Sequence, residues 1–270
     1  IHPGSGMRWA EMGSAMVLPE YRATRAVMYL FRAMGRYLEE NPRDCDFFTS
    51  HLVTSHARSQ KLLLKIKPPF IPLFLFPNMV PRPEFIGITE GSRGRESLLW
   101  SFSMARGFRF GALYAPRARH GIIRRLLDNT GHGEAVTIEE AFREPAQAAT
   151  RLRVERVDHQ GFALVYLESV GADWFEALTR ELMALVAAGL ESIAVNVPAT
   201  APQPKDMEAQ LASINLLFSG VNMTALDAPH LAYTLSTRPI GFDDIHLQDA
   251  AARELLDSMR DEYAALRRGG

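Results

Sequence analysis

The sequence has one cysteine, no long apolar run and almost no net charge, and each of these shortages excludes something. Cys45 has no second cysteine to pair with, so no intrachain disulfide can form and we expect a reducing, cytoplasmic location. No apolar run reaches the roughly 20 residues that a membrane-spanning helix needs, so we expect no membrane partner. The formal net charge of -1, from 30 basic and 31 acidic residues, gives no overall attraction to nucleic acid.

The chain does have enough apolar residues for a substantial core, because 47% of its 270 residues are hydrophobic. Its patterns predict an α/β (α+β) fold, with a mixed sheet flanked by helices. The order strand, helix, strand, helix, strand occurs in both halves, so we interpret the chain as two related units. We expect the first unit at 1–130, a linker at 131–150 and the second unit, which ends in a C-terminal helix, at 151–270.

Three local predictions bear on this organisation. Apolar residues at three- and four-residue steps predict a helix from Thr24 to Glu40, which Asn41-Pro42 ends. The prolines between 68 and 83 exclude a helix there, so we expect at most an edge strand at 71–76. In the second half, we expect a helix from Asp206 to Phe218.

The segment from Glu11 to Arg22 reads E-M-G-S-A-M-V-L-P-E-Y-R and resembles the cofactor strand of the GNAT superfamily of N-acyltransferases. In that superfamily the strand ends in Val-x-Pro-x-Tyr-Arg and turns into a helix. The main-chain N–H groups and the dipole of that helix face the pyrophosphate of acyl-CoA. The resemblance implies two sets of cofactor-binding residues. The main chain of Met16, Val17 and Leu18 would align the pantetheine, and Arg22, Ala23, Thr24, Arg25, Ala26 and Val27 would hold the pyrophosphate.

A second segment, from Val53 to Lys61, looks like the Val-Thr-x-His-x-x-Ser-Gln segment of one bacterial branch of the superfamily. The resemblance implies Glu11 as a base and His56 as a proton shuttle, because acyl transfer to an amine needs both an acid and a base. Ser59 would contact the cofactor or cap a helix. The plainer interpretations are that Glu11 is a surface carboxylate and that His56 caps or packs.

The sequence also departs from the superfamily pattern. Arg25 and Val27 fill positions where the family has small residues, and a guanidinium at Arg25 would either obstruct the phosphates or pair with them. Leu63 stands where a tyrosine often acts as the acid. Two functions therefore stay open. The first is transfer of an acyl group, typically acetyl, from acyl-CoA to a small-molecule or peptide amine. The alternative is a non-catalytic binding or regulatory module.

Two other kinds of ligand are weakly supported. His51 and His56, with Asp44, Cys45 and Asp46, match no standard zinc spacing, so we expect no metal. A basic cluster could bind nucleic acid, but few aromatic residues interleave it, and a solvated helix face is the better interpretation. Its members are Arg106, Arg109, Arg117, Arg119, His120, Arg124 and Arg125. The sequence leaves the oligomeric state open.

Overall fold

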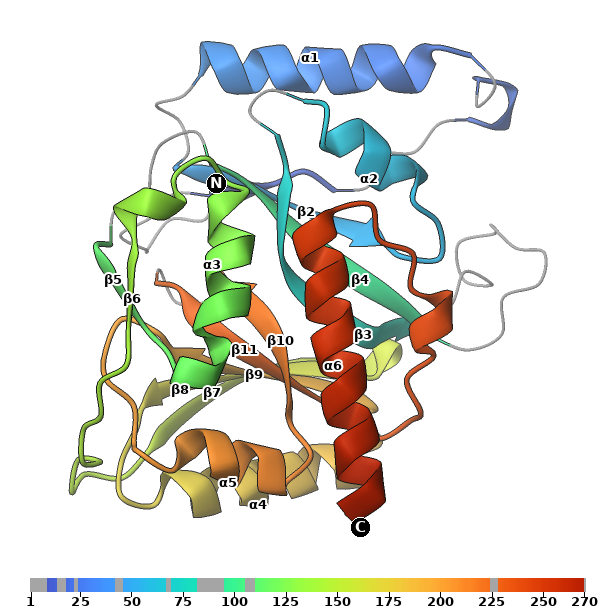
Figure 1. Cartoon of the computed structure of the whole chain (residues 1–270). Helices are drawn as coiled ribbons and strands as arrows, with labels where there is room; N and C mark the ends of the chain where they lie inside the picture. Colours follow the sequence, from blue (N-terminus) through green and yellow to red (C-terminus); the bar gives the residue numbers. More distant parts are fainter. Residues whose placement is uncertain are drawn as a thin grey trace.

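In the computed structural model, nine of the described strands form one mixed sheet (Figure 1). The structure describes residues 9–13, 18–21, 24–41, 46–66, 69–81, 95–104, 110–223 and 228–269. The strands are β1 (Trp9–Glu11), β2 (Phe47–Val53), β3 (Ile71–Pro81), β4 (Arg95–Met104), β5 (Ala112–Tyr114), β6 (Thr137–Glu139), β7 (Arg151–Val157), β8 (Phe162–Ser169), β9 (Ser192–Pro198), β10 (Leu217–Asn222) and β11 (His230–Ser236). The α-helices are α1 (Ala26–Glu40), α2 (Arg58–Leu63), α3 (His120–Asp128), α4 (Trp174–Ala187), α5 (Met207–Ser213) and α6 (Ala250–Gly269).

The two halves of this sheet are connected in the same order. The strand order is β1-β2-β4-β3-β10-β11-β9-β8-β7. In the first half, β1 and β2 are parallel and joined through α1, and β4 then inserts between β2 and β3. In the second half, β8 and β9 are parallel and joined through α4, and β11 inserts between β9 and β10. Each half is thus a strand–helix–strand crossover followed by a helix and an antiparallel hairpin.

The halves meet where β3 pairs antiparallel with β10, so they form one continuous sheet. Gly220 of β10 lies opposite Phe74 and has a φ of +123°, and a Cβ there would come within 2.2 Å of the Leu73 carbonyl oxygen. Only glycine fits this close approach without strain. Helices α3 and α6 both pack on β3 and β10, and Figure 1 shows them across the same side of the sheet.

Two local predictions are wrong. Strand β3 is not an edge strand, because β4 and β10 flank it. Its prolines are tolerated because the pairing with β4 shifts between Pro72 and Phe74 and again between Phe76 and Val80. The helix expected to end at Phe218 stops at Ser213, since Asn215 takes a left-handed conformation with φ of 61°. The helix predicted from Thr24 is confirmed from Ala26 to Glu40.

The predicted division at residues 130 and 150 is not tested by this architecture. Residues 131–150 contain a short 3-10 turn at Gly133–Ala135 and β6, which pairs with β5 in a separate two-stranded sheet. The segment from Ala146 to Thr150 forms hydrogen bonds with the turn that follows β8.

Candidate functional site

The carboxyl end of β1 brings an acid and an imidazole together. Glu11 is the last residue of β1 and lies opposite Thr49 of β2. Its Oε1 is 3.2 Å from Nδ1 of His51, and the two side chains remain 41% and 25% exposed. A carboxylate at Nδ1 favours the tautomer in which Nε2 is the basic nitrogen. The pair can therefore accept a proton at Nε2.

Trp100 of β4 supports this imidazole. The rings of His51 and Trp100 stack with centroids 4.2 Å apart, and Phe74 packs edge-on against the indole with centroids 5.1 Å apart. His51 lies opposite Trp100 in the β2–β4 register. Sequence reasoning considered His51 only as a metal ligand and did not select Trp100, because the register that joins them leaves no signal in the sequence.

The described residues of the turn into α1 are exposed. Leu18 and Tyr21 are 62% and 52% exposed. The Thr24 hydroxyl donates to the Tyr21 carbonyl (2.7 Å) and accepts from the Ala26 N–H (3.1 Å), so this side chain occupies one main-chain donor of the helix start. Arg25, at the N-cap, is exposed and has no acidic partner among the described residues.

The predicted cofactor-binding residues are only partly visible in this turn. Thr24, Arg25, Ala26 and Val27 lie together at the start of α1, and Leu18 precedes them. Met16, Val17, Arg22 and Ala23 lie outside the described residues.

The second predicted segment is largely a structural link. The buried Glu96 carboxylate accepts from the N–H groups of Thr54 (2.9 Å) and Ser55 (2.7 Å). Gln60 donates to the His246 carbonyl (2.8 Å) and accepts from the Gln248 N–H (3.0 Å). The Thr54 carbonyl accepts from the His246 N–H (2.8 Å). Thr54 and Gln60 therefore hold the start of α2 against the segment that precedes α6.

Three other residues of this segment have different environments. His56 is exposed, and no described contact joins it to Glu11. The hydroxyl of Ser59 is buried without a hydrogen-bond partner among the described residues. Leu63 is only 2% exposed and belongs to the core, so no proton donor stands at that position. The predicted roles of His56 and Ser59 stay predictions.

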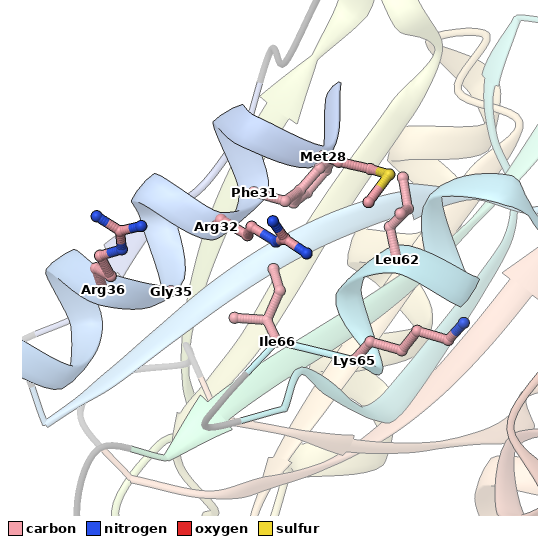
Figure 2. A pocket seen from close by; sticks show the side chains of 8 residues that line it. All are labelled: Met28, Phe31, Arg32, Gly35, Arg36, Leu62, Lys65 and Ile66. Atoms are coloured by element: carbon pink, nitrogen blue, oxygen red, sulfur yellow. The ribbon is translucent and has the colours of Figure 1, made fainter. Parts of the chain in front are cut away.

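A groove of about 410 Å³ lies between α1 and α2. Figure 2 shows Met28 of α1 reaching toward Leu62 of α2, with the Arg32 guanidinium between the two helices. The residues that line the groove are apolar or cationic, and none of them is acidic. They are Met28, Phe31, Arg32, Gly35, Arg36, Leu62, Lys65 and Ile66. No described residue forms an ion pair with Arg32, Arg36 or Lys65. The groove thus suits an anionic ligand with an apolar part.

The second parallel pair also leads into a turn, but here the chain itself closes the turn. The N–H of Gly171 donates to the Thr150 hydroxyl (2.9 Å), and the N–H of Ala172 donates to the Ala146 carbonyl (2.8 Å). The N–H of Thr150 donates to the Asp173 carboxylate (2.8 Å). A Cβ on Gly171 would lie 2.0 Å from the Ala148 carbonyl oxygen. No external phosphate can use these donors while this segment is in place.

A cluster of buried polar side chains lies at the end of the β8–β9 ladder. Tyr166 and Asn196 form the last register pair of these strands, and the amide of Asn196 accepts from Asn222 (2.8 Å). His230 packs edge-on against Tyr166, and its Nδ1 lies 2.8 Å from the Ala228 carbonyl. Burial lowers the pKa of His230 to about 4, so the imidazole is neutral at physiological pH.

Two arginines of the basic cluster are neutralised within the protein. Arg119 pairs with Glu208 and Glu262, and Arg125 pairs with Glu254. Burial alone would lower the pKa of Arg119, but Glu262 and Glu208 outweigh it and raise that pKa. Arg106 and Arg109 lie outside the described residues. Arg119 and Arg125 therefore offer little unpaired charge to a nucleic acid, whereas Arg117 is exposed and its guanidinium has no ion pair with a described residue.

Comparisons with protein-family models, with curated proteins and with solved structures find no match. Within the described ranges, no helix combines the length and the apolar character needed to cross a membrane.

Proposed function

We propose that the chain is a pair of GNAT-type units and that the first unit binds an acyl-CoA and transfers its acyl group to an amine. The observation that carries the proposal is the connection order shared by the two halves. Each half has a parallel β-α-β crossover, and in the first half this crossover spans the segment from Glu11 to Val53 that carries the sequence resemblance. In both halves a helix begins beyond the place where the parallel ladder ends, and a helix start favours a phosphate.

Only the first unit offers this turn to a cofactor. The described residues of its turn are exposed, and Arg25 lies at the helix start with no described acidic partner. Arg32 lies seven residues further along α1, roughly 10 Å along the helix axis. Arg25 at one end and the cationic groove at the other make the surface of α1 complementary to the several phosphates of CoA.

The proposed chemistry uses the pair at the end of β1. The Glu11 carboxylate orients His51, and Nε2 of His51 takes the proton of the attacking amine. The amine nitrogen forms a bond with the thioester carbon, and the bond from that carbon to sulfur then breaks. The imidazolium returns the proton to the departing thiolate, so one side chain acts first as base and then as acid. No covalent enzyme intermediate forms.

Isothermal titration with acetyl-CoA and a thiol-release assay with a panel of amines test the proposal. Arg25→Ala should weaken cofactor binding about 10-fold, since it removes a charge-assisted contact. Arg180→Ala is the matched control, because Arg180 is an exposed arginine on α4, the corresponding helix of the second unit. If millimolar acetyl-CoA gives no binding heat, the proposal is wrong.

The turnover arm compares two histidines. His51→Gln should abolish most thiol release while cofactor binding stays unchanged, whereas His56→Gln tests the role that the sequence predicts for His56. Loss of turnover in His56→Gln alone would move the proton transfer to His56 and reject the role of His51.

One observation favours the non-catalytic alternative. Leu63 is buried in the core, at the position where the resemblance would have an acid. A module that binds acyl-CoA without turnover would give binding heat with wild-type protein and no thiol release with any amine of the panel.

A further inference from the structure

Two buried donors beside the Glu11–His51 pair have no hydrogen-bond partner among the described residues. Nε1 of Trp100 and Oγ1 of Thr49 are both shielded from solvent, and neither makes a hydrogen bond to a described residue. A buried polar atom without a partner lowers stability, so such atoms in a folded protein need an explanation. A ligand that supplies the missing partner is one such explanation.

Strand geometry places both donors on the face that carries the pair. Side chains two residues apart in a strand share a face, so Thr49 lies beside His51 in β2. Thr49 lies opposite Glu11 of β1, and His51 lies opposite Trp100 of β4. The four side chains therefore form one patch across three neighbouring strands.

Ser101 provides a contrast in the same strand. Its hydroxyl is also buried without a described partner, but Ser101 follows Trp100 directly and is thus on the opposite face of the sheet. It lies opposite Ser50, away from the Glu11–His51 pair. Absence of a partner alone therefore does not mark a ligand site, and the position beside the pair is what distinguishes Thr49 and Trp100.

The chemistry of the donors specifies the ligand group. The indole N–H can only donate, so its partner must be an acceptor such as a carbonyl oxygen. A threonine hydroxyl can donate to the same oxygen. We infer that Trp100 Nε1 and Thr49 Oγ1 bind the carbonyl oxygen of the acyl group, an inference that rests on the proposed function.

These donors would act most strongly during the reaction. When the amine attacks, the carbonyl oxygen gains negative charge, and it returns to a carbonyl when the thiolate leaves. Fixed donors aimed at that oxygen stabilise the charged state more than the ground state. The partly exposed Glu11 and His51 form the open side of the patch, so the acyl group would reach the donors past the pair that handles the proton.

The test removes each donor, with valine in place of Thr49 and phenylalanine in place of Trp100. Thr49→Val and Trp100→Phe should each lower the turnover rate about 100-fold and leave the affinity for CoA itself unchanged. Acetyl-CoA should bind wild-type protein more tightly than CoA does, and this preference should disappear in both variants. Ser101→Ala, the matched control, should change neither the rate nor the preference.

Thermal unfolding separates a ligand role from a structural one. Because the Thr49 hydroxyl lacks a described partner and valine keeps the shape of threonine, Thr49→Val should unfold at the same temperature as wild type or higher. Trp100→Phe also removes buried ring volume, so it should unfold at a lower temperature whether or not the indole N–H binds a ligand. A clear loss of stability in Thr49→Val, with Ser101→Ala unaffected, would mean that the Thr49 hydroxyl has a structural partner and would overturn the inference.

A measurement on the wild-type side chain covers the case in which a variant does not fold. The ¹⁵N-labelled indole signal of Trp100 should move on addition of acetyl-CoA and less on addition of CoA. If both ligands bind and move the signal equally, the inference is wrong while the proposed function stands. If neither ligand binds, the proposed function is wrong and this inference with it.

Discussion

The turn into α1 and the turn into α4 follow the same kind of parallel strand, yet they are surrounded differently. The described residues of the first are exposed, and an arginine, Arg25, is the N-cap of its helix. The second has its Gly171 and Ala172 donors bound to Thr150 and Ala146 of its own chain. A shared chain path therefore does not ensure a shared site, because the segments packed on a turn decide whether its donors can reach a ligand.

The strand residues that precede the two turns also differ in their exposure to solvent. Glu11 and His51 stay partly exposed and are joined by a 3.2 Å contact. At the corresponding place in the second half, Tyr166, Asn196 and His230 are buried. We interpret the first as a place where protons can be exchanged with a ligand and the second as a polar part of the core.

The largest expected effect tests whether the turn before α4 is closed as tightly as its contacts indicate. Gly171→Ala should destabilise the protein by about 3 kcal/mol or more, because the new Cβ would collide with main-chain atoms of Ala148 and Thr150 that cannot rotate away. Denaturant unfolding monitored by circular dichroism measures this change.

Gly121→Ala is its control. Gly121 lies in α3, and a Cβ added there would meet nothing within 4 Å beyond its own helix, so alanine should be neutral or stabilise by up to about 1 kcal/mol. Equal effects of the two substitutions would show that the turn before α4 has room, and the contrast between the turns would lose its basis.

A second prediction concerns the buried strand end. Because burial lowers the pKa of His230 to about 4, the unfolded chain binds a proton near pH 6.5 before the folded protein does. The free energy of unfolding should therefore fall as the pH drops from 6.5 to 4, by up to about 3 kcal/mol from this group. In His230→Asn that contribution should vanish, as measured by denaturant unfolding at several pH values.

His159→Asn serves as the control, because this turn residue lies in the exposed connection between β7 and β8. It should keep the wild-type pH dependence. If His230→Asn keeps it as well, His230 is protonated in the folded protein, and the second strand end is more open than the contrast between the halves requires.

The sequence allowed the local elements to be predicted better than their partners. The apolar stripe from Val27 to Leu38 was sufficient for α1, because helix periodicity is local. The His51–Trp100 stack depends on the β2–β4 register, and the closed turn depends on residues 146–150, which the sequence presented only as a linker. Main-chain hydrogen bonds between distant segments leave no residue signature, so both features required the structure.

The smallest expected effect tests the hydrogen bond that closes the turn before α4. Thr150→Val removes the acceptor of the Gly171 N–H and keeps the shape of the side chain. The lost hydrogen bond should cost about 1 kcal/mol and speed amide exchange at Gly171 several-fold. Thr179→Val is the matched control, since the Thr179 hydroxyl is buried without a described partner and its removal should not change that exchange.

Asp173 adds a pH dependence with a defined sign. Hydrogen bonds from Thr150, chiefly from its main-chain N–H and to a smaller extent from its side chain, lower the pKa of Asp173 below its ordinary value of 3.8. Its stabilising contribution is therefore complete above that ordinary value and is lost as the pH falls through the lowered pKa. In Asp173→Asn, the opening of the turn, followed by amide exchange at Gly171, should no longer increase as the pH falls. If wild type and Thr150→Val exchange Gly171 at the same rate at every pH, other contacts close this turn, and the difference between the two turns has another cause.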